Sequence, residues 1–236
     1  MPVAAISDIH GNLPALEAVL ADIEREDVDG IVVAGDTISG PWPAEVFDVL
    51  AAAGARHVRG NADRLALTGG EGDIGDWSAQ RLGDRREAVA AWPLVLELTI
   101  DGLGDVLVCH ATPTSDEPIY TRVTPDQEIA RLFSGVDPDV VVCGHTHIQY
   151  DRALANGLRI VNPGSVGMPY EGRRGAFWAV LGPDVELRWS EYDIEAAAMA
   201  MREREAPNVE EQLVKYLLEP PDPTDVTAYF ETLRAA

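Results

Sequence analysis

The chain has 236 residues, of which 46% are hydrophobic and 25% are charged, as is ordinary for one globular domain with a packed core. Its 40 acidic and 18 basic residues give a formal net charge of −22, which disfavours binding to long nucleic acids, because that binding depends on Lys and Arg. A small phosphate compound can still bind where local cations outweigh the overall charge. No apolar stretch approaches the ~20 residues that span a bilayer, and no signal peptide is recognisable, so we expect a cytoplasmic protein without a membrane partner.

The first sixty residues alternate short apolar strands with helices. We expect strands over 3–7, 31–34 and 56–59, a helix capped by Asn12 after the first strand, and a second helix over 43–53. Because strands joined through helices pair in parallel, this alternation predicts a parallel sheet that is buried on both faces.

The rest of the chain is less regular. Residues 68–92 are rich in Gly, Asp and Arg with a modest helical pattern, and we interpret them as a helical cap insertion in a single domain over 1–236. The later elements are strands over 94–100, 105–109, 139–143, 149–154, 158–161, 176–181 and 185–191, a helix over 125–134, and helices over 194–204, 208–218 and 224–234. We expect the last four strands to form a second, antiparallel sheet, and residues 193–236 to be a helical C-terminal extension.

Side chains that bind metals follow directly after the predicted strands. Four of the five histidines stand at such positions, which a random distribution would rarely produce. In open α/β sheets, ligand sites form beyond the carboxyl ends of the strands, so these residues should meet at one edge. They are Asp8, His10, Asp36, Asn61, His110, His145 and His147.

Seven imidazole, carboxylate and amide groups are too many for one first-row ion and suit two. Mixed nitrogen and oxygen donors favour Mn, Fe, Co, Ni or Zn over Ca or Mg, and we expect manganese to support activity. A shared carboxylate would hold the two ions ~3.5–4 Å apart, as in two-metal hydrolases. Such a pair would lower the pKa of a bridging solvent molecule and present hydroxide as a nucleophile, so that no separate base is required.

The ordered set Asp-x-His, Gly-Asp, Gly-Asn-x-Asp, His and Gly-His-x-His resembles the calcineurin-like metallophosphoesterase superfamily, over residues 2 to about 192. The resemblance implies an α/β fold, a four-layered α/β/β/α sandwich with a dinuclear site between its sheets. It implies that a first ion is held by Asp8, His10, Asp36 and His147, and that a second is held by Asp36, Asn61, His110 and His145. It also implies that Asp36, Asn61 and His110 take part in catalysis, with Asp36 bridging the ions.

Two further features qualify this resemblance. Residues 162–169, Asn-Pro-Gly-Ser-Val-Gly-Met-Pro, are similar to the small bacterial and archaeal phosphodiesterase branch, which the retromer subunit of the same fold also resembles. Many family members carry a histidine where this chain has Ala62, so protonation of the leaving group has no assigned donor. Asp63 is expected to cap the next helix rather than to orient such a histidine.

Three side chains are candidates for substrate binding. Arg59 and Arg64 flank Asn61 and could contact phosphate, with surface ion pairs as the alternative. Asn12 could reach the phosphate or the metal-bound solvent, or could serve only as a helix cap. Two cysteines, Cys109 and Cys143, lie in apolar runs that predict buried thiols on core strands.

The leading hypothesis is a metal-dependent phosphodiesterase or phosphatase that acts on a small phosphoester substrate. One alternative is a dinucleoside polyphosphate hydrolase, in which Trp77 or Tyr150 would stack on adenine. The others are a protein phosphatase and a catalytically weak metal-binding scaffold similar to the retromer subunit, which the alanine at position 62 slightly favours.

Overall fold

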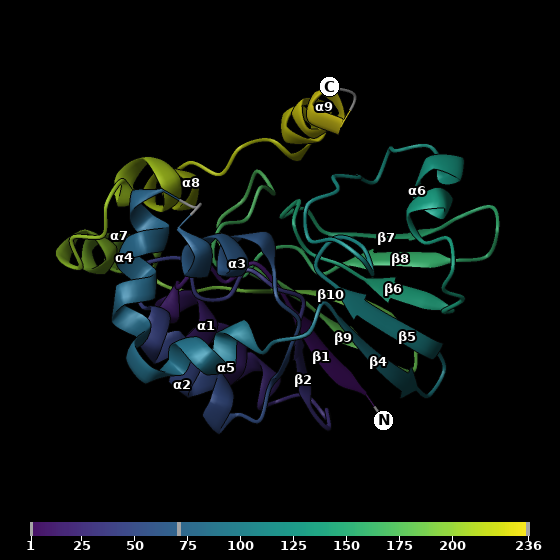
Figure 1. Ribbon diagram of the computed structural model, residues 1–236, viewed down its shortest axis with the longest axis horizontal. Helices are drawn as coiled ribbons and strands as arrows, with labels where there is room; N and C mark the ends of the chain where they lie inside the picture. Colours follow the sequence, from purple (N-terminus) through teal and green to yellow (C-terminus); the bar gives the residue numbers. More distant parts are fainter. Residues whose placement is uncertain (1, 70–71, 235–236) are drawn as a thin grey trace.

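Two five-stranded sheets pack face to face in the computed structural model, which describes residues 2–69 and 72–234 (Figure 1). The strand order is β10-β9-β1-β2-β3 in the first sheet and β4-β5-β6-β8-β7 in the second. The strands are β1 (Val3–Ile6), β2 (Ile31–Val33), β3 (Arg56–His57), β4 (Val95–Ile100), β5 (Gly104–Cys109), β6 (Val140–Val142), β7 (Tyr150–Ala153), β8 (Arg159–Asn162), β9 (Ala176–Leu181) and β10 (Val185–Ser190).

Helices cover the outer faces of the two sheets. They are α1 (Leu13–Ile23), α2 (Pro43–Ala52), α3 (Asn61–Thr68), α4 (Asp73–Leu82), α5 (Arg86–Ala90), α6 (Asp126–Leu132), α7 (Ile194–Glu203), α8 (Lys215–Leu218) and α9 (Pro223–Arg234), with a 3-10 turn η1 (Gly83–Arg85) and a π-helical turn η2 (Glu210–Val214). In the described residues, no helix has both the length and the apolar character that crossing a membrane would require.

Successive side chains of each strand point to opposite faces of its sheet, and this alternation builds one core between the sheets and one under each helical layer. Ala5 of β1 packs between the sheets with Val106 of β5, while its neighbour Ile6 points outward against Leu16 of α1. In the second sheet, Leu107 of β5 points outward against α6. The result is two sheets between two helical layers, which confirms the predicted α/β/β/α sandwich.

The prediction of a separate antiparallel sheet from the last four strands is wrong. Strand β9 pairs antiparallel with β1, as in Val3 opposite Leu181, so β9 and β10 extend the first sheet. Strand β8 pairs parallel with β6, as in Val140 opposite Arg159, so β7 and β8 extend the second. The sequence pattern of a hairpin is the same whether the hairpin extends an existing sheet or forms a new one. The pattern therefore could not show which sheet each pair of strands joins.

The segment 68–92 contains α4, η1 and α5, and residues 70–71 lie outside the described part of the chain. Helix α4 is fastened to the loop that follows β2, because Ser78 Oγ accepts from the amide of Gly40 (2.9 Å) and lies 3.1 Å from its carbonyl oxygen. The helices of this segment therefore extend the helical layer beside α2 and α3.

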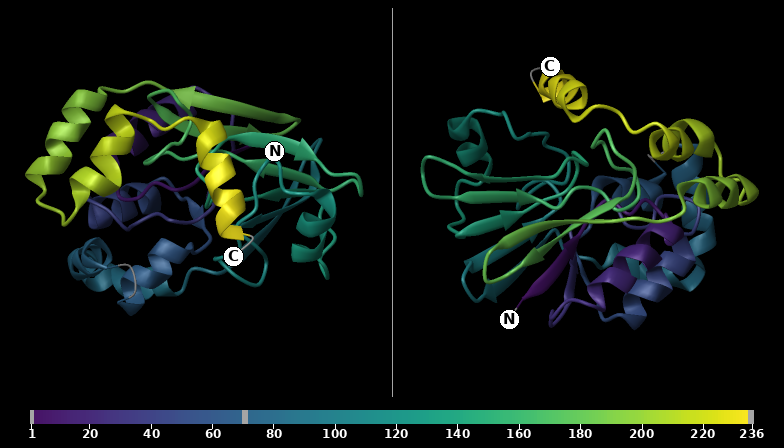
Figure 2. Two further views of the ribbon diagram at one scale, coloured as in Figure 1. Left: turned by 90° about the horizontal axis from the view of Figure 1, so that it is seen from above. Right: turned by 180° about the vertical axis from the view of Figure 1, so that it is seen from behind.

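The C-terminal extension runs across the molecule (Figure 2). Helix α7 packs with the helical layer of the first sheet, whereas α9 lies on the side of the second sheet. Between them, the amide of Gly172 donates to the carbonyl of Pro221 (2.9 Å), and Thr121 Oγ1 then donates to Glu231 of α9 (2.6 Å). The tail thus joins the two halves of the sandwich above the loop around residues 165–172.

Candidate metal centre

All seven predicted metal-binding side chains come from the carboxyl ends of parallel strands, and they meet where the two sheets adjoin. The first sheet supplies four of them after β1, β2 and β3, and the second supplies three after β5 and β6. Those from the first sheet are Asp8, His10, Asp36 and Asn61, and those from the second are His110, His145 and His147. Neither sheet alone could build the site.

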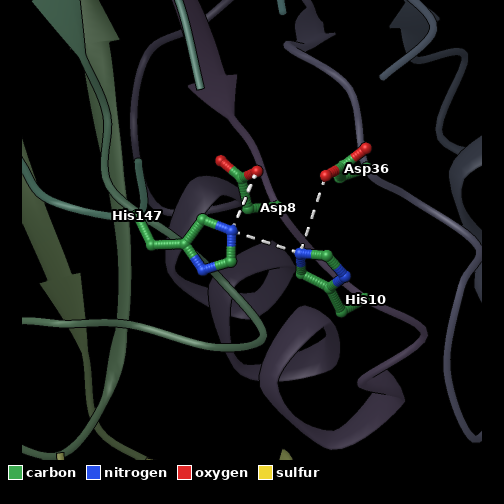
Figure 3. A group of neighbouring side chains, drawn as sticks. All are labelled: Asp8, His10, Asp36 and His147. Atoms are coloured by element: carbon green, nitrogen blue, oxygen red, sulfur yellow. Dashed lines mark hydrogen bonds and ion pairs between the residues drawn. The ribbon is translucent and has the colours of Figure 1, made fainter. Parts of the chain in front are cut away.

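One group of donors consists of Asp8, His10, Asp36 and His147, which are all buried (Figure 3). His10 Nε2 lies 3.3 Å from His147 Nε2 and 3.9 Å from Asp36 Oδ2, and His147 Nε2 lies 3.3 Å from Asp8 Oδ1. Carboxylate oxygens and imidazole nitrogens thus converge on one point, in a set that suits a first-row transition metal.

Asp36 also belongs to a second group, with His110 and His145. His110 Nε2 lies 3.3 Å from Asp36 Oδ2 and 3.1 Å from His145 Nδ1. Asn61 Oδ1 joins this group through its amide oxygen, 3.0 Å from His110 Nε2. The Asp36 carboxylate is therefore common to two adjacent donor sets.

Backbone carbonyls hold three of the imidazoles in the orientation that metal binding needs. His110 Nδ1 lies 2.8 Å from the carbonyl oxygen of Ala34, and His147 Nδ1 lies 2.7 Å from that of Met168. His145 is reversed, with Nε2 3.1 Å from the carbonyl oxygen of Glu117. Because a carbonyl only accepts, the bonded nitrogen carries a proton, and the other nitrogen faces the centre, where it can offer a lone pair to a metal ion once it is unprotonated.

Charges within the centre divide the histidines into two kinds. Burial, followed by the neighbouring imidazole of His147, lowers the pKa of His10 to about 4, and burial with His110 lowers the pKa of His145 to about 4. Burial also opposes charge on His110, but Asp36 outweighs it and raises that pKa to about 10. Burial would raise the pKa of Asp36, but His110 lowers it well below its usual value. Asp8 likewise outweighs burial and raises the pKa of His147. The pairs His10/His147 and His110/His145 thus each contain one imidazole that readily takes a positive charge, a role that a bound metal ion would also fill.

The backbone is strained at five of these positions. Asp8, His10, Asp36, His145 and His147 all have φ between 46° and 71°, the left-handed region that costs a non-glycine residue roughly 1–2 kcal/mol. Such strain concentrates at functional sites. It persists here because the surrounding loops are packed without spare room.

Two glycines make this close packing possible. A Cβ atom at Gly60 would lie 2.1 Å from Asp36 Oδ1, and one at Gly144 would lie 2.0 Å from Ser7 Oγ and 2.6 Å from Asp8 Oδ2. Any side chain at either position would displace a carboxylate of the centre. The donor chemistry, the strain and the packing together fit a site for divalent metal ions.

The predicted substrate-binding side chains have other partners. Asn12 is fully buried, accepts from the amide of Ala15 as the cap of α1, and donates to the carbonyl of Gly167 (3.0 Å). Arg59 Nη1 reaches the carbonyl of Ala90 (3.4 Å). The geometry therefore supports the helix-cap alternative for Asn12, and a substrate contact by either residue stays a prediction without support.

Acidic side chains engage the third candidate, Arg64. Its guanidinium bonds both oxygens of Asp116, at 2.8–3.2 Å, and lies 2.7 Å from Glu117 Oε1. The carbonyl of the same Glu117 accepts from His145. Arg64 thus supports the loop that orients a predicted metal-binding residue, and it is not free to bind phosphate in this arrangement.

Comparison with known proteins agrees with this centre. The profile of the calcineurin-like phosphoesterase superfamily domain matches residues 1–182. The chain belongs to the calcineurin-like phosphoesterase superfamily. It is therefore a metal-dependent phosphoesterase, and its buried Asp and His clusters are where metal can bind.

Relatives of this calcineurin-like phosphoesterase share most of its length. The crystal structure of a metallophosphoesterase from Sphaerobacter thermophilus is 28% identical with a TM-score of 0.73, covering 93% of this chain and 99% of that one. The hypothetical protein PH1004 from Pyrococcus horikoshii OT3 has a TM-score of 0.79 at 22% identity, covering 94% of this chain and 99% of that one, and so shares the fold. The uncharacterized protein MJ0912 from Methanocaldococcus jannaschii is 28% identical over 222 residues, 83% of this chain and 89% of that protein.

Sequence reasoning missed several residues that shape this phosphoesterase centre. The carbonyls of Ala34, Met168 and Glu117 orient three imidazoles, but a backbone carbonyl has no signature in a sequence. Tyr170 stacks on His147, with ring centroids 4.7 Å apart and planes 17° apart. Of the two stacking candidates named from the sequence, Tyr150 is buried in the outer core of the second sheet, and Trp77 packs against the first core with the guanidinium of Arg81 3.6 Å from its ring centre.

Proposed function

We propose that this chain hydrolyses a phosphodiester bond in a small substrate with the help of two divalent metal ions. The observation that carries the proposal is the position of Asp36 between two donor sets. Asp8, His10, Asp36 and His147 would hold one ion, and Asp36, Asn61, His110 and His145 would hold the other. When bound, such ions supply a nucleophile at neutral pH and neutralise charge on the phosphate oxygens.

The chain's own residues prepare the site for this chemistry. The carbonyls of Ala34, Met168 and Glu117 fix the imidazole rings, so little reorganisation is needed when ligands bind. The amide of Ala62 donates to Asp36 Oδ1 (2.8 Å) and holds the shared carboxylate in place. Position 62 thereby contributes its backbone, while its methyl side chain offers no proton to a leaving group.

Because Ala62 supplies no proton to the leaving group, we expect substrates with good leaving groups. It also keeps a second candidate open, a catalytically weak metal-binding scaffold. The two candidates differ in turnover, not in metal content. A small phosphodiester is the proposed substrate class, a manganese pair the proposed cofactor and the cytoplasm the proposed location.

The test combines metal analysis with an assay. Gently purified protein should contain close to two equivalents of divalent transition metal, and the manganese-loaded protein should hydrolyse bis(p-nitrophenyl) phosphate faster than p-nitrophenyl phosphate. Asp36→Asn should lose both metals and nearly all turnover. Arg25→Ala, at an exposed position outside both donor sets, is the control that should keep both. Undiminished turnover in Asp36→Asn would refute the two-metal proposal, and two bound metals without turnover of either ester would favour the scaffold.

A further inference from the structure

A cavity of about 250 Å³ opens beside the metal centre on the side of His10. Its wall includes His10, the loop residues Met168 and Tyr170, and three residues of the C-terminal extension, Glu211, Gln212 and Tyr216. This volume is below the roughly 300–1,000 Å³ that encloses a drug-sized ligand, so the cavity suits a single ring system. Because His10 belongs to a donor set, a group attached to a phosphate at the centre can extend into the cavity.

The tail presents its polar residues to this cavity through an irregular turn. Residues Glu210–Val214 form a π-helical turn, a feature often found at functional sites. Leu213 and Val214 are buried in the core beneath the first helical layer and anchor the turn. Glu211 and Gln212 precede this anchor and remain exposed, so their side chains are held beside the cavity by a fixed backbone.

Glu211 differs from the neighbouring Glu210 in whether its carboxylate has a partner. Glu210 forms a two-pronged ion pair with Arg202, with both distances 2.7 Å. The side chain of Glu211 has neither an ion pair nor a hydrogen bond to any residue within 2–69 and 72–234. Its carboxylate therefore offers acceptor oxygens to a ligand and repels a second anion.

We propose that this cavity receives the organic group of the phosphodiester and selects a nucleobase that carries an exocyclic amino group. This inference rests on the proposed phosphodiesterase function and narrows its substrate class. The apolar surface of Tyr216, Tyr170 and Met168 accommodates a flat ring, and Glu211 accepts hydrogen bonds from the amino group. The same carboxylate disfavours a polyphosphate chain, which argues against a dinucleoside polyphosphate as the substrate.

A matched pair of substrates isolates the amino group. The p-nitrophenyl esters of cytidine 5′-monophosphate and of the corresponding pyrimidin-2-one riboside 5′-monophosphate share their sugar, leaving group and N3 acceptor, and differ only in the C4 amino group, which pyrimidin-2-one lacks. Because hydrogen bonds to charged groups are strong, kcat/KM for the cytidine ester should be about tenfold higher in the manganese-loaded enzyme. Glu211→Gln should reduce this preference to about twofold or less. Glu210→Gln, whose side chain pairs with Arg202, should leave it unchanged.

A binding measurement makes the test independent of turnover. By isothermal titration calorimetry, the metal-free protein should bind cytidine about tenfold more tightly than the pyrimidin-2-one riboside, and Tyr216→Ala should weaken both by a similar factor, since stacking does not depend on the amino group. Equal affinity for the two nucleosides would overturn the proposed nucleobase subsite. An unchanged preference for cytidine in Glu211→Gln would overturn it as well. If no ester is hydrolysed, not even bis(p-nitrophenyl) phosphate, the proposed function fails, and the nucleoside affinities still decide the subsite.

Discussion

Asp63 Oδ1 lies 2.8 Å from the amide nitrogen of Thr37, the residue that follows the shared Asp36. The same carboxylate also accepts from the amides of Ile38 (3.0 Å) and Gly60 (3.1 Å), so it joins the loop after β2 to the start of α3. Burial and the charge of Asp36 raise the pKa of Asp63 to about 7, against the effect of its three amide donors. Asp63 thus helps to cap α3, as expected, but from the third position inside the helix, where it accepts from the amide of the cap residue Gly60. The carboxylate also ties together two loops that carry metal-binding residues.

Replacement of this carboxylate should destabilise the fold. Asp63→Ala leaves three buried amides without their acceptor, and each unsatisfied buried group costs about 1–3 kcal/mol. We expect the free energy of unfolding in urea to fall by at least about 3 kcal/mol. Asp22→Ala, which breaks a surface ion pair with Arg25, should cost less than about 1 kcal/mol. Equal losses in the two variants would contradict the role of Asp63.

Metal removal should lower thermal stability. A ligand present at a thousandfold excess over its Kd stabilises the native state by about 4 kcal/mol, and each kcal/mol corresponds to about 2–4 °C in a domain of this size. Scanning calorimetry should therefore show a fall in Tm of about 10 °C when a chelator is added. The chelator should have little effect on Asp36→Asn. An unchanged Tm in the wild-type protein would exclude tight metal binding.

His57 should make stability depend on pH. Its ring stacks on Trp92 with centroids 4.3 Å apart, its Nδ1 is buried without a partner, and burial lowers its pKa to about 4. Between pH 6.5 and 4, the unfolded chain binds a proton at His57 that the folded chain does not. The free energy of unfolding therefore has its full value, as far as His57 is concerned, above pH 6.5, and it decreases as the pH falls from 6.5 to 4.

The matched variant for this effect is His57→Phe, which keeps an aromatic ring against Trp92 and does not titrate. The difference in unfolding free energy between wild type and variant should be constant above pH 7. By pH 4, the wild type should have lost up to about 3 kcal/mol relative to the variant. Denaturant unfolding at pH 7.5 and 4.5 measures it. A difference that is the same at both values would show that His57 is not held neutral.

Both cysteines should be unreactive in the folded protein. Burial raises the pKa of the Cys109 thiol well above its usual value and that of Cys143 to about 11. Because the thiolate is the reactive form, a thiol reagent such as 5,5′-dithiobis(2-nitrobenzoate) at pH 8 should label neither cysteine until denaturant is added. Labelling at the rate of free cysteine in the native protein would place a thiol at the surface and contradict the predicted core position.

Helix α9 should open more readily than the rest of the chain. Thr227 is the buried residue of this helix, and Glu231 links the helix to Thr121 and Thr124. Amide exchange followed by mass spectrometry should show faster exchange over 223–234 than over α1, and faster still in Glu231→Ala. Asp225→Ala, on the same helix, is the control and should leave the rate unchanged. Protection of α9 equal to that of α1 would mean that the tail is part of the main cooperative unit.

The sequence predicted the centre better than it predicted the sheets. Residues such as Asp36 and His110 could be placed together because parallel strands end at a common edge, a rule that needs only the order of elements. Strand β9 could not be assigned to β1, because its pairing depends on contacts across more than 170 residues. Arg64 shows the same limit, since nothing near it in the chain reveals that Asp116 is its partner.

Five metal-binding positions combine a left-handed backbone, which lowers stability, with a side chain that the centre needs. They are Asp8, His10, Asp36, His145 and His147. Glycine adopts this conformation without steric cost, so each of the five positions would suit the fold better without its side chain. A descendant freed from selection for hydrolysis should accumulate glycines there and gain heat resistance as it loses its ions. Holding Asp or His at all five positions therefore costs this chain backbone stability that glycine would not cost.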